Sequence, residues 1–109
     1  MKLLSRIEEV LLLAIWRLQD EAYGVPIREE VIRATGQHWH LGAIYGPLGR
    51  LYKNGYVFTV DGEPTPERGG RSKVFYRLTA KGREALRDLY RVNQELWTGI
   101  SVVELEEEP

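Results

Sequence analysis

The residues best suited to chemistry in this chain are a short group of cations on a glycine-rich segment. Arg68, Arg71 and Lys73 flank Gly69-Gly70, so three positive charges stand on a backbone with little steric bulk. Such a loop is able to bridge phosphates or to enter the narrow minor groove of a DNA duplex. The alternative is an ordinary solvated turn. The pattern favours contact with a phosphate backbone.

The distribution of charge along the chain supports the same interpretation, although the net charge is only −1. Residues 1–37 carry five basic and six acidic side chains (−1), residues 38–91 carry ten and five (+5), and residues 92–109 carry none and five (−5). A basic central segment is typical of a phosphate binder, although a solvated face gives the same pattern. Double-stranded DNA is therefore the expected partner.

Other kinds of site find little support. The chain has no cysteine, so disulfides and thiolate metal sites are excluded and the cytoplasm is the expected compartment. His38 and His40 alternate around Trp39, but no third ligand is evident and no metal site is predicted. Three candidate hydroxyl nucleophiles lack a neighbouring histidine: Ser5, Ser72 and Thr79. Neither an enzyme activity nor a cofactor is predicted.

The first apolar run, Val10 to Trp16, is seven residues long, and two glutamates precede it. A membrane span needs about 20 apolar residues, and no small-residue cleavage site follows the run. Neither a signal peptide nor a membrane span is predicted.

The elements that must position the cations begin with three helices. Ser5 and Glu8 form a capping-box pattern at the start of a first helix that is apolar nearly all round, so we expect this helix to be buried between others. A second helix is predicted over about 25–35. A third covers about 41–54, where Asn54-Gly55 supplies the stop.

A hairpin and a last helix follow. Tyr56 to Val60 and Lys73 to Leu78 have the composition of strands, and residues 61–70 between them form a turn-rich loop. Thr79 is suited to cap a final helix that ends at about Trp97. The order predicts a mainly helical α+β fold, the winged helix-turn-helix.

Three domains are expected. Residues 1–79 form the winged-helix DNA-binding domain and residues 80–98 a C-terminal dimerisation helix. Residues 99–109 form an acidic tail that we expect to be frayed.

The third helix has two contrasting faces. Its inward side carries Ile44, Leu48 and Leu51, and the opposite side carries Gly42, Gly46, Gly49 and Lys53. Each interior glycine costs about 1 kcal/mol of helix stability against alanine, and an interior proline such as Pro47 costs up to about 3 kcal/mol. Something outside the helix should offset this cost.

A bare helix face would allow close approach to DNA. The side chains left to contact phosphates or bases stand at its edges: His40, Tyr45, Arg50 and Lys53. The alternative is that the glycines pack against another protein surface.

The last helix is apolar over more than the roughly 100° that a single core requires. One stripe consists of Ala85, Leu89, Val92 and Leu96, and an adjacent one of Leu86, Tyr90, Asn93 and Trp97. We expect one stripe to dock on the first helix. We expect the adjacent stripe to contact a twin subunit through Leu86, Tyr90, Asn93 and Trp97. Trp16 and Trp97 are candidates for an aromatic effector pocket at that interface, the alternative being ordinary core.

Three segments, in order, resemble the PadR-like family of transcriptional regulators. Tyr23-Gly24 with Ile27 resembles the opening of the family's second helix. GAIYGPLGRLYKNGYV is similar to its recognition helix, and RGGRSKVFYRLTAKG to its wing signature. The resemblance implies a dimeric DNA-binding repressor whose final helix pairs the subunits and whose dimer binds small aromatic effectors.

The chain is similar to the short class of this family, with one helix after the wing. Family members usually carry larger side chains on the outward face of the recognition helix. Sequence preference is therefore expected to depend on DNA shape and the wing more than on this helix. The predicted function is a homodimeric transcriptional repressor, and the alternative is a winged-helix protein–protein interaction module that does not bind DNA.

Overall fold

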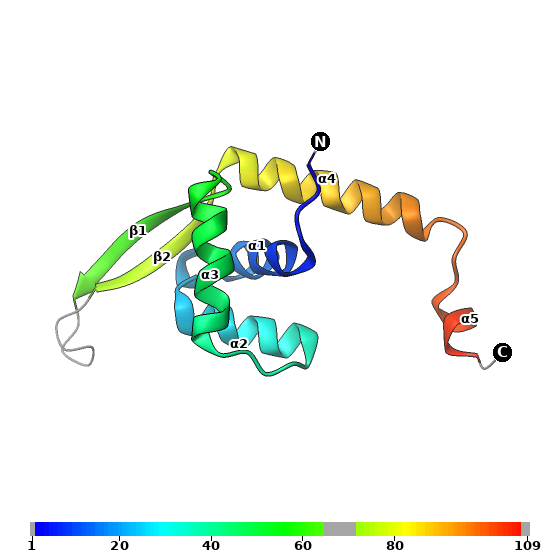
Figure 1. The fold of residues 1–109 in the computed structure, drawn as a ribbon, viewed down its shortest axis with the longest axis horizontal. Coiled ribbons are helices and arrows are strands. Elements are labelled where there is room, and N and C mark those ends of the chain that lie inside the picture. The colour runs from blue at the N-terminus through cyan, green and yellow to red at the C-terminus, as the bar shows by residue number, and fades with distance from the viewer. Residues whose placement is uncertain (1, 65–71, 108–109) are drawn as a thin grey trace.

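The fold is taken from a computed structural model that describes residues 2–64 and 72–107. Its elements, in chain order, are α1 (Arg6–Leu18), a 3-10 helix η1 (Gln19–Glu21), α2 (Gly24–Thr35), α3 (Leu41–Lys53), β1 (Val57–Pro64), β2 (Ser72–Leu78), α4 (Ala80–Trp97) and α5 (Val102–Glu106). Helices α1, α2 and α3 gather into a bundle, the hairpin extends from one side of it, and α4 crosses α1 and continues beyond (Figure 1). The winged helix-turn-helix prediction is confirmed.

Helix α1 starts at the predicted capping box. The Glu8 amide donates to Ser5 Oγ at 3.3 Å, and the Ser5 amide donates to Glu8 Oε1 at 2.9 Å. The expectation that α1 is buried all round is wrong for the single chain, because Leu13 is 47% and Trp16 50% exposed. The elements that contact α1 cover only part of its surface.

Helices α2 and α3 contribute the centre of the core. Ile27 of α2 is fully buried, as are Ile44, Leu48 and Leu51 of α3. The predicted inward face of α3 is therefore correct. Pro47 lies inside α3 rather than at its start, and the buried apolar residues offset the lost backbone hydrogen bond.

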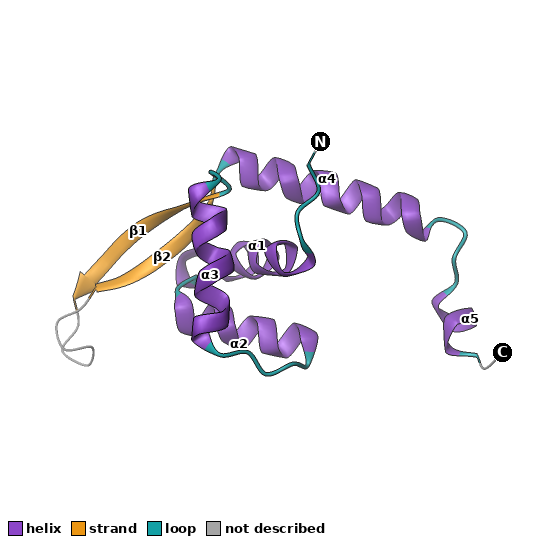
Figure 2. Ribbon diagram, in the orientation of Figure 1, coloured by secondary structure: helices purple, strands orange, loops and turns teal. Residues whose placement is uncertain are grey.

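The hairpin is antiparallel and longer than predicted. Val57 pairs with Leu78 and Val60 with Phe75, but β1 continues to Pro64 through residues assigned from the sequence to a loop. A shift of register after Asp61 allows this extension, and proline is tolerated at the end of an edge strand. Figure 2 shows both strands reaching well beyond the helices.

Helix α4 begins at the predicted cap, where the Gly82 amide donates to Thr79 Oγ1 at 3.1 Å. The chain has a radius of gyration of 16.3 Å and a longest dimension of 57 Å. A compact domain of about 100 residues has a radius near 13 Å, so the projecting helix and hairpin make this chain elongated. Within the acidic tail, α5 forms a short helix with no buried residue.

Candidate nucleic-acid interface

The outward face of α3 is open. Gly42, Gly46, Gly49 and Lys53 are all exposed. A Cβ added at Gly42 or Gly49 would meet nothing within 4 Å, and at Gly46 it would lie 4.0 Å from Arg50 Nη1. The glycines are therefore not required for packing within the described chain, and the face is free to approach a ligand.

The predicted edge residues surround this face. Tyr45 is 47% exposed, and Arg50 and Lys53 are exposed on α3. His40 occupies the N-cap position of α3, and its side chain makes no capping hydrogen bond to that helix.

Arg50 also lies near an acidic side chain of its own chain, that of Glu8. Burial disfavours the ionised form of Glu8, but hydrogen bonds from Ser5 and the nearby Arg50 guanidinium lower the pKa of the Glu8 carboxyl below its ordinary value. The Glu8 carboxylate and the Arg50 guanidinium thus lie close enough for their charges to attract one another.

The base of the wing is joined to the start of α2 through Tyr23. The Lys73 ammonium lies 4.5 Å from the centre of the Tyr23 ring and 3.5 Å from its hydroxyl. The edge of Tyr23 also meets Phe75, with ring centres 5.3 Å apart. The Tyr76 amide donates to the Ala22 carbonyl at 2.7 Å. These contacts hold β2 in a defined position against the helices.

The remaining cations of the wing fall into two groups. Arg68 and Arg71, predicted to contact DNA, lie outside the described residues. Arg77 lies on β2 and its Nη1 is 2.5 Å from Asp20 Oδ1, so it ties the wing to η1.

The turn between α2 and α3 is held by Arg28, which sequence reasoning missed. Its Nε donates to the Trp39 carbonyl at 2.5 Å, and its Nη2 lies 3.4 Å from His38 Nε2. The His38 and His40 rings lie 5.4 Å apart, edge to face. Over the described part of the chain, no three His, Cys, Asp or Glu side chains are grouped to hold a metal ion. No local sequence pattern marks Arg28, because its partners are ten or eleven residues away.

The four predicted dimer-interface residues divide between two environments. Tyr90 is 67% and Trp97 49% exposed, whereas Leu86 packs against the core of its own chain. Asn93 Nδ2 donates to Glu9 Oε2 at 3.1 Å, which links α4 to α1. Tyr90 and Trp97 are thus available to a partner, and Leu86 and Asn93 are engaged within the subunit.

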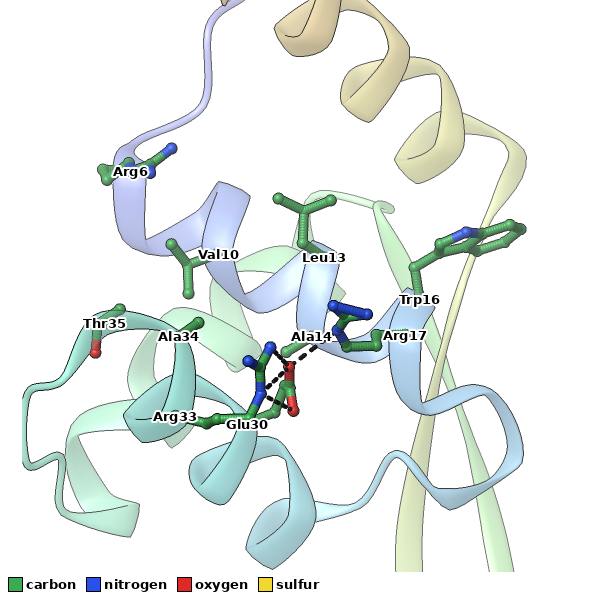
Figure 3. Close-up of a pocket in the computed structure, with 10 residues that line it drawn as sticks. All are labelled: Arg6, Val10, Leu13, Ala14, Trp16, Arg17, Glu30, Arg33, Ala34 and Thr35. Atoms are coloured by element: carbon green, nitrogen blue, oxygen red, sulfur yellow. Dashed lines mark hydrogen bonds and ion pairs between the residues drawn. The ribbon is translucent and has the colours of Figure 1, made fainter. Parts of the chain in front are cut away.

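A groove of about 480 Å³ runs between α1 and α2 (Figure 3). Arg17 Nε lies 3.1 Å from Glu30 Oε1, and Arg33 also pairs with Glu30. Leu13 and Trp16 project from α1 away from the Glu30 carboxylate. Trp16 lines this groove, but Trp97, the other half of the expected effector pocket, is not among its lining residues.

An exposed third helix in a three-helix bundle, beside a two-stranded wing, defines the winged helix-turn-helix DNA-binding proteins. Residues 12–88 match the transcriptional regulator PadR-like family. The chain therefore belongs to this family, and it is a DNA-binding transcriptional regulator. The family is one of regulators and not a class of enzymes.

Solved structures share this fold. A PadR-like transcriptional regulator from Bacillus cereus has a TM-score of 0.72 at 22% identity, covering 94% of this chain and 93% of that one. A PadR-like transcription factor from Bacteroides fragilis has a TM-score of 0.70 at 24% identity, covering 89% and 88%. A PadR family regulator from Clostridium difficile has a TM-score of 0.62 at 20% identity, covering 86% and 96%. No curated protein matches the chain.

Crossing a membrane would require a longer or more apolar helix than any in the described residues.

Proposed function

We propose that the chain acts as a homodimeric repressor that binds operator DNA through α3 and the wing. The observation that carries this proposal is the open face of α3 beside a wing whose base is fixed to α2. Glycines on that face allow close approach to the duplex, and Arg50 and Lys53 supply charge at its edge. Because the face offers few base-reading groups, preference should depend mainly on DNA shape and the wing.

The dimer is supported by apolar side chains that the single chain leaves exposed. On α1 and α4 these are Leu13, Trp16, Tyr90, Leu96 and Trp97. A second copy that covered them would bury a large apolar area, which stabilises association. A two-fold dimer would present its two α3 helices to half-sites about 34–36 Å apart.

Relief of repression by a small aromatic effector completes the proposal. Trp16 and Trp97 are each about half-exposed, at 50% and 49%, so both rings would be open to an aromatic ligand at the interface between two subunits. The protein would act in the cytoplasm, where operator DNA is found.

Removing charge from the wing tests the proposal. The double variant Arg68→Ala with Arg71→Ala should weaken binding to every duplex, because these cations would neutralise phosphates. It should also reduce the log–log salt dependence of the binding constant by roughly two. Fluorescence anisotropy titrations on duplex DNA at several salt concentrations give both quantities.

A matched control is Arg87→Ala with Arg91→Ala, which removes the same charge from α4 and should leave the slope nearly unchanged. An unaltered slope in the wing variant would remove the wing from the interface. Footprinting on DNA selected by the protein supplies the second arm. Failure to protect any selected fragment would favour the alternative, a protein–protein interaction module.

A further inference from the structure

A small hollow of about 190 Å³ lies where α2, α3 and β2 meet. Its polar lining consists of Lys73 and the tyrosines Tyr23, Tyr45 and Tyr76. All of its lining residues are described, and none is acidic. The hollow therefore combines one positive charge with hydroxyl donors, and no carboxylate in its wall opposes an anion.

The ammonium of Lys73 is held in place by its neighbours. It lies 4.5 Å from the centre of the Tyr23 ring and 3.5 Å from the Tyr23 hydroxyl. Ring and cation attract one another, which limits the conformations that this long side chain samples. Lys73 thus presents its charge at a defined position between the wing and α2.

Two further tyrosines line the hollow, Tyr45 from α3 and Tyr76 from β2. The Tyr45 hydroxyl from α3 packs so closely on Gly24 that a Cβ at that position would overlap it. Burial, together with the nearby Tyr45, raises the pKa of the Tyr76 hydroxyl above its ordinary value of 10.0. Tyr76 therefore remains a neutral hydrogen-bond donor at physiological pH.

We propose that this hollow binds a single phosphate of the DNA backbone. Lys73 supplies the charge, and Tyr23 and Tyr45 donate their hydroxyl protons to the phosphate oxygens. The inference rests on the proposed DNA-binding function and deepens it, because one phosphate would be shared by the wing, α2 and α3. Such a contact fixes the register of the recognition helix on the duplex, as phosphate contacts do generally.

The test is a coupling measurement on a duplex that the protein selects from random sequence. Each backbone phosphate in turn is replaced by an uncharged methylphosphonate, and the affinity of the wild type is measured. Phosphates that meet other cations of the protein should also lose affinity, but the phosphate in the hollow should show a loss of about tenfold, typical of one charge-assisted hydrogen-bonded contact, and should be the one coupled to Lys73 and Tyr45. The variants Lys73→Gln and Tyr45→Phe should bind the unmodified duplex more weakly than the wild type does. On the duplex with the methylphosphonate at that position they should bind as tightly as the wild type, because the side-chain change and the phosphate change remove the same interaction.

Lys81→Gln is the matched control. The Lys81 ammonium also lies 4.5 Å from a tyrosine ring centre, that of Tyr56, but it donates to the Asn54 carbonyl at 2.7 Å. The loss of binding free energy caused by Lys81→Gln should add to the loss caused by each methylphosphonate substitution. Thermal unfolding of each variant shows whether a loss of affinity reflects unfolding.

Additive effects of Lys73→Gln and Tyr45→Phe at every phosphate, in a wild type that binds DNA, would overturn the phosphate site and leave the proposed function standing. Absence of DNA binding by the wild type would overturn both. Titration with inorganic phosphate, followed by NMR, distinguishes the source of the anion. Binding of free phosphate without coupling to any backbone position would contradict the inference.

Discussion

At the scale of single residues, Tyr45 shows how a side chain on α3 depends on a residue of another helix. Tyr45 is 47% exposed, yet its hydroxyl packs on Gly24 at the start of α2. Only a residue without a Cβ leaves room for that contact. Gly24 therefore positions the Tyr45 side chain and also forms the first residue of α2.

The variant Gly24→Ala should therefore reduce DNA affinity without reducing the stability of the fold. The backbone at Gly24 is helical and has no positive φ, so alanine should keep or raise stability by up to about 1 kcal/mol. The new methyl group should displace the Tyr45 hydroxyl, and DNA affinity should fall. Thermal unfolding and anisotropy titration measure the two effects.

Gly82→Ala provides the contrast. At Gly82 a Cβ would overlap the backbone carbonyl of Tyr56, which cannot swing aside as a side chain can. We expect a loss of about 1–3 kcal/mol of stability, as for other overpacked sites.

Undiminished DNA affinity in the Gly24 variant would show that the placement of Tyr45 does not matter for binding.

At the scale of elements, a charge network joins α1 to α2. Glu30 on α2 accepts from Arg33 of the same helix and pairs with Arg17 of α1 at 3.1 Å. The hydrogen bond from Arg33 lowers the pKa of the Glu30 carboxyl below its ordinary value of 4.5, and the charge of Arg17 acts in the same direction, although burial opposes both. Ionised Glu30 therefore stabilises the pairing of the two helices.

This network predicts a pH-dependent stability. Because the pKa of Glu30 is lower in the folded state, its contribution is fully present above about pH 4.5 and is lost as the pH falls through the folded value. Glu30→Gln should lower the free energy of unfolding at pH 7, and the difference from wild type should shrink as the solution is acidified. Urea unfolding at a series of pH values measures it.

Glu29→Gln, at an exposed neighbouring position, is the control and should change stability little at any of these pH values. A constant difference between wild type and Glu30→Gln across the acid range would contradict the assignment.

At the scale of the whole molecule, α4 has apolar side chains that its own chain leaves exposed. Leu89 is buried and Asn93 reaches Glu9, but Tyr90, Leu96 and Trp97 remain exposed where the helix projects past the bundle. Figure 1 shows this projection, with α5 carried beyond it. A second subunit on this surface would also set the distance between two recognition helices.

Trp97→Ala together with Tyr90→Ala should weaken the dimer. Large aromatic residues at the centre of an interface often contribute 2 kcal/mol or more, so we expect the dissociation constant to rise roughly 30-fold or more. Sedimentation equilibrium measures it. The exposed α4 residue Glu95 offers a control, because Glu95→Ala should leave association nearly unchanged.

Dimer weakening should also reduce the preference for two correctly spaced half-sites, because a monomer reads only one. A monomeric wild-type protein, or a double variant that associates as tightly as wild type, would exclude this surface as the interface.

The sequence by itself determined the four longer helices and the hairpin, but neither η1 nor α5. Capping at Ser5 and Thr79, and the apolar spacing of Ile44, Leu48 and Leu51, depend on residues within one or two helical turns, so local physics suffices to recognise them. The same spacing predicted the open glycine face of α3. Where pairing between strands matters, as at the end of β1, local composition was misleading.

Only the tertiary structure decided how the site is assembled. Lys73 and Tyr23 are 50 residues apart in the chain, and Asn93 and Glu9 are 84 apart. Such contacts exist only after the hairpin and α4 have packed on the bundle. The spacing of apolar residues within one segment does not determine where another segment packs against it. The hollow between α2, α3 and β2 is of this kind, since its wall is built from three elements that meet only in the folded chain.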